Sequence, residues 1–258
     1  MLRDMKDLIC ATALEAGKII MAGYTRIKCI EVKEGLGIVT DVDLKSEEFI
    51  IDRLTKGLPE SSVLSEERGE QNKSGSPYKW IIDPLDGTSN FAHGFPWFCV
   101  SIALEKEGEV IAGAIYHPIM KDMFFAEKDK GAFLNDNPIE VSKTTGIKKS
   151  LIATGFFYQT GEELSESVKR FEKVQQVALG VRRAGSAALD LAYAACGRFD
   201  AFWEKGLCPW DKAAGEIIFR EAKGTITDFG GNAFSIYGNE TLATNGLLHE
   251  SMIELLKI

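Results

Sequence analysis

Residues 80–91, with the sequence WIIDPLDGTSNF, place the strongest constraint on the fold. An apolar, strand-like run ends at Asp83, a second acid follows at Asp86, and small polar residues occupy 87–90. A carboxylate at the end of a buried strand is costly unless a cation or hydrogen-bond donors compensate it. The fold must therefore bring a compensating group to this point.

The residue types around these two acids favour a hard divalent cation. Pro84 stiffens the bend and leaves the carbonyl of Leu85 free, which gives three oxygen donors together with Asp83 and Asp86. Mg²⁺ prefers carboxylate, carbonyl and water oxygens, and the sequence has no Cys/His cluster that would favour zinc. The small residues that follow expose backbone amides, which suit a phosphate group. Asp-Pro and Asp-Gly are also ordinary turn dipeptides, so a simple strand-ending turn remains the alternative.

Two other acidic segments could complete such a site. SEERG at 65–69 follows an apolar run and offers Glu66, although adjacent glutamates usually belong to a solvated loop. CPWDKAAGE at 208–216 places Asp211 at the start of an Ala-rich helix, where an N-terminal cap is the simpler explanation. The three histidines have no Ser or Cys partner in a nucleophile motif, which argues against hydrolysis by a triad.

Charge and cysteine usage exclude several classes of protein. The formal net charge is −8 over 258 residues, which argues against direct binding to nucleic acid and against attraction to anionic membranes. The five cysteines are scattered and include no C-x-x-C pair, as expected for reduced thiols. No apolar run reaches the roughly 18 residues of a membrane span, and the first 20 residues lack the apolar core of a signal peptide. We expect a soluble cytoplasmic protein.

The spacing of apolar residues predicts an α+β fold. Helical spacing covers the first 20 residues and resumes at 44–54, after the acidic segment TDVD at 40–43. Strand-like runs follow at 62–65, 80–83, 97–104, 110–117 and 122–127, in an antiparallel arrangement, with a loop at 69–77. Beyond residue 143 the pattern predicts strands at 151–156, 200–204 and 224–229, and helices at 162–178, 186–196, 211–222 and from about Leu247. We expect one domain over 1–258, with subdomains of approximately 1–145 and 146–258.

Taken together, the acidic segments resemble the motifs of the inositol monophosphatase family. The resemblance is carried by WIIDPLDGTSNF at 80–91, PWDKAAGEIIFREAKGTITDFGG at 209–231, RRAGSAALDLAYAACGRFDAFWE at 182–204 and VTDVDLKSE at 39–47. This family belongs to a wider group of Mg²⁺-dependent, lithium-sensitive sugar-phosphate phosphatases that includes the fructose-1,6-bisphosphatases and the 3′-phosphoadenosine phosphatases. The resemblance implies a single catalytic domain with a layered αβαβα sandwich fold, and a homodimer.

The resemblance also implies a role for individual residues. One Mg²⁺ is expected on Glu66, Asp83 and the Leu85 carbonyl, a second on Asp83, Asp86 and Asp211, and a third, weaker ion through Glu66. Asp43 and Thr88 correspond to the pair that orients the attacking water. Substrate contacts are expected at Asp86, Gly87, Thr88, Gly185, Ser186, Ala187, Glu204 and Asp211. Lys33 matches a loop lysine near the phosphate, and 31–43, with Gly35 and Gly37, is the segment expected to form a mobile lid.

The implied activity is hydrolysis of a polyol phosphate monoester by metal-activated water, without a phospho-enzyme. Inositol-1-phosphate is the expected substrate. Fructose-1,6-bisphosphate, or both substrates, is the alternative, and Arg182 and Arg183 could meet its second phosphate. A different class of function is also open, in which the protein is a regulatory subunit of a transcription or RNA-processing complex. The intact set Glu66, Asp83, Asp86, Thr88 and Asp211 favours the enzyme.

Overall fold

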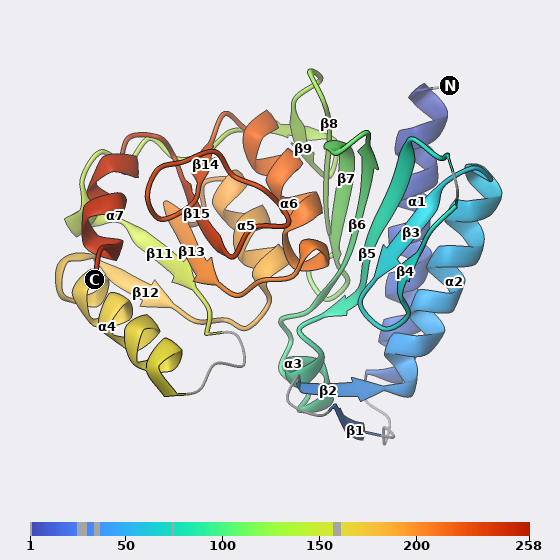
Figure 1. Cartoon of the computed structure of the whole chain (residues 1–258), viewed down its shortest axis with the longest axis horizontal. Coiled ribbons are helices and arrows are strands. Elements are labelled where there is room, and N and C mark those ends of the chain that lie inside the picture. The colour runs from blue at the N-terminus through green and yellow to red at the C-terminus, as the bar shows by residue number, and fades with distance from the viewer. Residues whose placement is uncertain (1, 25–29, 34–36, 74, 157–160) are drawn as a thin grey trace.

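The structure, a computed structural model, describes residues 2–24, 30–33, 37–73, 75–156 and 161–258. Helices and sheets alternate in five layers across the molecule (Figure 1). Two helices cover the outer face of a large sheet, two more lie between this sheet and a smaller one, and a last pair covers the far side of the smaller sheet. The predicted αβαβα sandwich is confirmed.

The large sheet has eight strands in the order β10-β9-β8-β7-β6-β5-β3-β4. Its strands are β3 Ser62–Ser65, β4 Gly69–Gln71, β5 Tyr78–Asp86, β6 Cys99–Lys106, β7 Glu109–His117, β8 Asp122–Glu127, β9 Ala132–Leu134 and β10 Asn137–Ile139. All neighbours pair antiparallel except β3 and β5, which run parallel. The ends of β3 and β5 therefore lie at the same edge of the sheet.

The smaller sheet has five strands in the order β12-β11-β13-β15-β14. They are β11 Leu151–Thr154, β12 Gly180–Arg182, β13 Ala201–Lys205, β14 Thr225–Thr227 and β15 Glu240–Thr244. β11 pairs parallel with β12 and β13, whereas β15 pairs antiparallel with β13 and β14. A separate hairpin joins β1 Ile30–Lys33 to β2 Gly37–Thr40.

The helices take their positions from these sheets. They are α1 Leu2–Gly23, α2 Asp41–Gly57, α3 Thr88–Ala92, α4 Gly161–Val177, α5 Ala187–Ala195, α6 Pro209–Glu221 and α7 His249–Leu256, with a short 3₁₀ turn at Ile147–Lys149. α1 and α2 cover the large sheet, α5 and α6 form the middle layer, and α4 and α7 form the outer layer beyond the smaller sheet (Figure 1).

Burial on both faces explains why the central strands of the large sheet are apolar almost without interruption. In β6, Val100, Ile102 and Leu104 point into the core shared with α1 and α2. The alternate residues Cys99 and Ala103 point into the core shared with α5 and α6. A strand with one solvent-exposed face would have polar residues at alternate positions. The continuous run of this strand is thus a direct consequence of the layered fold.

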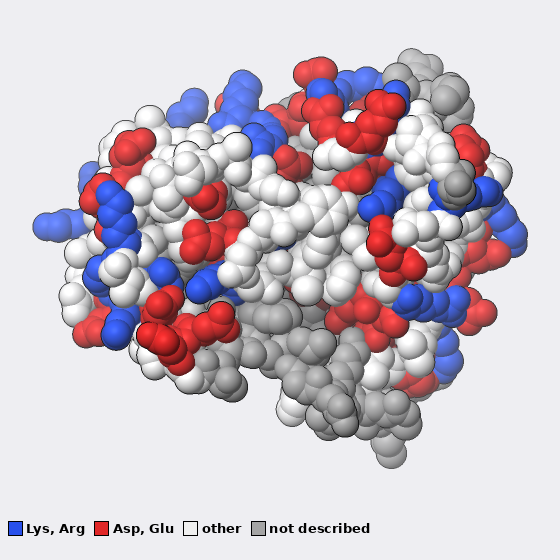
Figure 2. Space-filling model, viewed as in Figure 1, with Lys and Arg blue, Asp and Glu red and all other residues white. Residues whose placement is uncertain are grey.

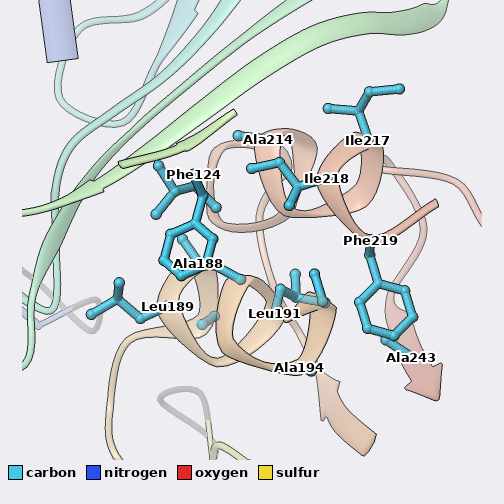
Figure 3. Packing of buried hydrophobic residues seen from close by; sticks show 14 of the residues in the cluster. Phe124, Ala188, Leu189, Leu191, Ala194, Ala214, Ile217, Ile218, Phe219 and Ala243 are labelled. Carbon is cyan, nitrogen blue, oxygen red and sulfur yellow. The ribbon is translucent and has the colours of Figure 1, made fainter. Parts of the chain in front are cut away.

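The middle layer joins the two sheets through tightly packed small and branched side chains. Leu189 and Leu191 of α5, Ile218 of α6 and Phe124 of β8 belong to one buried cluster (Figure 3). Gly113 of β7 permits the approach of α6, because a Cβ at this position would lie 2.9 Å from the Cα of Ala214. This contact sets how closely α6 lies on the large sheet.

We expect Gly113→Ala to destabilise the protein by about 1–3 kcal/mol, because the added methyl group overpacks the α6 contact. Urea unfolding of the variant measures this loss. Gly146→Ala is the matched control, since nothing lies within 4 Å of a Cβ built there and its φ is −135°. Equal stability of Gly113→Ala and wild type would show that α6 does not depend on this close approach.

Several sequence predictions of element boundaries are wrong. The second helix begins at Asp41 rather than at 44, because Thr40 caps it and Asp43 completes a capping box. The stretch 69–77, expected to be a loop, contains β4, and the short strands β9, β10, β12 and β15 were not predicted. These elements have three to five residues each, too few to show a period.

Among the described residues, charged side chains of both signs are interspersed over the face shown in Figure 2. Within the described ranges, none of the helices combines the length and apolar character that a bilayer span requires. Cys10, Cys99, Cys196 and Cys208 are unpaired, and Cys29 lies outside the described residues.

Candidate active site

A pocket of about 630 Å³ opens where elements of both sheets end. It lies at the ends of β3 and β5, along β13, and at the starts of α3, α5 and α6. Eleven of the twelve site residues predicted from the sequence line it: Glu66, Asp83, Leu85, Asp86, Gly87, Thr88, Gly185, Ser186, Ala187, Glu204 and Asp211. Asp43 is fully buried behind this wall and reaches it through Thr88.

A β-bulge aims two of the acids into the same space. Side chains three residues apart on a regular strand point to opposite faces of the sheet. Between Asp83, which pairs with Ser101, and Asp86, which pairs with Cys99, β5 contains one residue more than β6. The extra residue turns the strand and brings Asp86 back toward Asp83. Asp211 joins them from α6, and one carboxylate oxygen of each lies within 4.8 Å of the others.

These carboxylates repel one another, and burial adds to the cost. The pKa of Asp83 is raised well above its ordinary value, first by burial and then by Glu66, Asp86 and Asp211. Burial likewise raises the pKa of Asp86 to about 6 and, with the charge of Asp86, raises that of Asp211 well above its ordinary value. Arg183 is the one Lys or Arg among the described residues of the pocket wall. The donor set, all oxygen and strongly negative, fits divalent cations such as Mg²⁺.

Hydrogen bonds hold each carboxylate and leave an oxygen that can bind a cation. Oδ2 of Asp86 accepts from the Ser186 hydroxyl at 2.6 Å and from the Ala188 amide at 2.8 Å. Oδ2 of Asp211 accepts from the Cys208 amide at 2.6 Å, in the capping box of α6. Asp211 therefore caps its helix and also faces the pocket, so the two explanations of this residue are compatible.

Thr88 and Asp43, which the resemblance pairs, are joined by a hydrogen bond. The Thr88 hydroxyl lies 2.9 Å from Oδ1 of Asp43 and 2.9 Å from the Leu85 carbonyl. Oδ2 of Asp43 accepts from the amide and the hydroxyl of Thr40. Burial raises the pKa of Asp43, and these hydrogen bonds oppose the rise. Asp43 is thus fixed at both oxygens, and it fixes Thr88 at the pocket wall.

Residues of α5 and β13 form another part of the pocket wall. Glu204 has its carboxylate close to Gly155, where a Cβ would lie 2.1 Å from Oε2, so only glycine leaves room for this side chain. Burial and the charge of Asp86 raise the pKa of Glu204 to about 8. The turn at Gly185 is held by Asn90, whose Nδ2 donates to the carbonyls of Ala184 and Gly185 at 2.9 and 3.2 Å.

Comparison with known proteins agrees with this geometry. The profile of the inositol monophosphatase family matches residues 1–258. The chain belongs to the inositol monophosphatase family. An inositol-1-monophosphatase of Synechocystis sp. is 38% identical over 256 residues, which cover 99% of this chain and 89% of the relative. The Nus factor SuhB of Pseudomonas aeruginosa is 38% identical over 237 residues, or 90% of this chain and 88% of the relative. The crystal structure of the extragenic suppressor protein suhB from Bartonella henselae superposes with a TM-score of 0.94 at 37% identity and 98% coverage of both chains.

Two pocket residues of this inositol monophosphatase family member were missed by sequence reasoning. Asp190 lies in the first turn of α5, is 1% exposed, and has its pKa raised by burial and by Glu204. Asn90 fastens the α5 side to the metal motif, since it also donates to the Trp97 carbonyl at 2.8 Å. The position of Asp190 within the apolar run AALDLA could have indicated a buried functional acid. Asn90 had no such feature, because it resembled an ordinary turn residue.

Of the three basic residues expected near the pocket, Arg183 lines it, Arg182 does not line it, and the side chain of Lys33 is not described. Arg183 lines the pocket and donates to the Phe156 carbonyl at 3.3 Å. Arg182 ends β12, and its side chain is exposed. The side chain of Lys33 and residue Gly35 lie outside the described residues, so the lid at 31–43 is described only in part.

Proposed function

We propose that this protein hydrolyses phosphate monoesters of polyols in a Mg²⁺-dependent reaction, with inositol-1-phosphate as the preferred substrate. The observation that carries the proposal is the convergence of Asp83, Asp86 and Asp211 in a pocket that Thr88 and Glu204 also line. A phosphate dianion entering so acidic a pocket needs cations to offset the repulsion, and one arginine is too few. The family to which the chain belongs supports the same activity.

The carboxylates would hold two Mg²⁺ ions, with a third, weaker one through Glu66. Glu66, Asp83 and the Leu85 carbonyl would hold one ion, and Asp83, Asp86 and Asp211 the second. When bound, the ions supply charge neutralisation for the phosphoryl group and activation of water for attack. No phospho-enzyme is required, because water rather than a side chain is the proposed nucleophile.

Thr88 is proposed to orient the attacking water. Its hydroxyl carries one proton, and donation to Asp43 leaves the oxygen lone pairs to accept from water. Asp43 itself is buried and held by Thr40, so this acceptor of the Thr88 proton is in place before substrate binds. The amides of Gly87 and Thr88 are proposed to bind phosphate. Gly87 allows the chain to pass close there, because a Cβ would lie 2.8 Å from the Trp97 carbonyl.

Glu204, with Gly185, Ser186 and Ala187, is proposed to recognise the polyol. A carboxyl side chain accepts hydrogen bonds from hydroxyl groups, and in its charged form it repels a second phosphate. The wall holds two acids, Asp190 and Glu204, against one arginine, Arg183. This balance supports a monophosphate such as inositol-1-phosphate over fructose-1,6-bisphosphate.

The test is phosphate release from inositol-1-phosphate, fructose-1,6-bisphosphate and phosphoadenosine phosphate, with Mg²⁺ and with chelator. We expect release to be highest from inositol-1-phosphate and to stop in chelator. Release that continues at full rate in chelator would reject the proposal, and faster release from the bisphosphate would select the alternative substrate.

In assays above pH 8, where Glu204 is charged although its pKa is raised to about 8, Glu204→Gln is expected to lower kcat/KM for inositol-1-phosphate by about 10- to 100-fold, because a hydrogen bond to a charged group contributes about 1.5–3 kcal/mol. The loss for the bisphosphate should be smaller. Glu172→Gln, on the exposed side of α4, is the matched control. An equal loss for every substrate would contradict a role for Glu204 in selection.

A second candidate function is favoured by the Nus factor name of the Pseudomonas relative. This protein would then also bind a transcription or RNA-processing complex, and it would do so without using the metal site. Asp83→Asn protein that captures such a complex as well as wild type, although it is inactive as a phosphatase, would support this second role.

We further propose that the chain forms a cytoplasmic homodimer of single catalytic domains, and equilibrium sedimentation tests the dimer.

A further inference from the structure

One face of α2 carries three polar side chains that are completely buried. Asp43, Ser46 and Glu47 are spaced i, i+3 and i+4, so they lie on the same side of the helix. Each is 0% exposed. Buried positions of this kind are normally apolar, and a buried carboxylate is costly unless it is paired. Their partners therefore indicate what this face does.

Glu47 holds the turn that carries Glu66. Its Oε1 accepts from the backbone amides of Glu67 at 3.0 Å and Arg68 at 3.2 Å, and its Oε2 lies 3.3 Å from Nε of Arg68. The amide of Glu66 itself donates to the Ile82 carbonyl of β5 at 3.2 Å. The backbone is thus fastened both at Glu66 and immediately after it.

Ser46 and Asp43 hold two further parts of the same pocket. The Ser46 hydroxyl donates to the Pro84 carbonyl at 2.9 Å, inside the bulge between Asp83 and Asp86. Asp43 accepts from Thr88 at 2.9 Å, as described above. A single rigid helix is therefore bonded to the Glu66 turn, to the bulge of β5 and to the start of α3.

We propose that Glu47 is a positioning residue, which with Ser46 holds the metal-binding carboxylates together against their mutual repulsion. The inference rests on the proposed metal site. Like charges brought into a buried site separate unless the backbone that carries them is fixed. Outer partners of this kind raise metal affinity because the ligands are already in place when the ion arrives. Glu47 touches neither substrate nor metal in this account and acts through Glu66.

The test measures Mg²⁺ binding by calorimetry in the absence of substrate. We expect Glu47→Ala to weaken Mg²⁺ binding by about 10- to 100-fold, and Glu47→Asp, which shortens the side chain by one methylene, to weaken it by an intermediate factor. In activity assays the half-saturating Mg²⁺ concentration rises by the same factor, whereas kcat at saturating Mg²⁺ is retained. Glu47→Gln keeps an acceptor for both amides and should restore most of the affinity.

Two controls separate positioning from a general loss of stability. Glu48→Ala removes the same charge one residue away, on the exposed side of α2, and should leave the Mg²⁺ Kd unchanged. Leu54→Ala removes a fully buried side chain from the same helix, and should lower Tm without changing the Kd.

A wild-type Kd in Glu47→Asp, or in a folded Glu47→Ala, would overturn the inference. If wild type itself binds no Mg²⁺, the proposed function fails first, so the two failures are distinguishable.

Discussion

Asp83→Asn will lower phosphate release from inositol-1-phosphate by at least about 10³-fold, because a metal ion supplies several kcal/mol of charge stabilisation and about 1.4 kcal/mol corresponds to a factor of ten. Asp83 is 1% exposed and is the acid proposed to bridge both ions. The asparagine side chain has nearly the same shape but no charge. The loss should appear in kcat at saturating substrate and should resist added Mg²⁺.

The control for this variant is Asp52→Asn, which makes the same change at an exposed position of α2. Its activity should equal that of wild type. Thermal unfolding in chelator should also show Asp83→Asn to be at least as stable as wild type, since the change removes a buried charge that repels its neighbours. An active Asp83→Asn enzyme would refute the metal assignment, whatever its stability.

Metal-free protein is expected to lose stability as the pH rises from 5 to 8. The pKa of Asp86 is raised from 3.8 to about 6 in the folded state, and those of Asp83 and Asp211 are raised well above 3.8. The folded state therefore binds protons more tightly than the unfolded state. The stability that this provides is present at low pH and is lost as the pH rises through the folded pKa values. For Asp86 alone the whole shift corresponds to roughly 3 kcal/mol, of which about 1.4 kcal/mol, or one pKa unit, is lost between pH 5 and pH 8.

Added Mg²⁺ should reverse this loss, because it binds the deprotonated carboxylates. Thermal unfolding at pH 5 and pH 8, with chelator and with Mg²⁺, measures both effects. The gain in Tm from Mg²⁺ should be larger at pH 8. Asp86→Asn is the matched variant, and its metal-free stability should depend less on pH between these values. The same pH dependence in wild type and Asp86→Asn would show that the cluster does not titrate as described.

The layered fold could be predicted largely because the long helices and strands show a clear periodic spacing of apolar residues. The apolar runs in β6, β7 and β8 and the spacing in α1 and α6 were sufficient for their type and approximate position. Short elements depended on tertiary contacts. β12 and β15 exist because they complete a sheet around β11 and β13, and no local pattern in three or five residues reveals this.

The candidate site was predicted in its composition but not in its geometry. The motif around Asp83 and Asp86 gave the candidate ligands, yet the bulge that turns both into one pocket depends on pairing with β6. The role of α2 was misplaced for a similar reason. TDVD was interpreted as an acidic segment before a helix, whereas Thr40 caps the helix and Asp43 lies within it. Glu47 gave no signal, because a glutamate in an exposed-looking helix suggests a solvated face until its partners are known.

Anomalous diffraction from crystals soaked in Mn²⁺, a substitute for Mg²⁺, tests the metal site most directly. We expect two strong anomalous peaks in the pocket, one beside Glu66 and Asp83 and one among Asp83, Asp86 and Asp211. Manganese peaks confined to other parts of the protein, with this pocket empty at saturating Mn²⁺, would contradict the proposal that these carboxylates gather cations for phosphate hydrolysis.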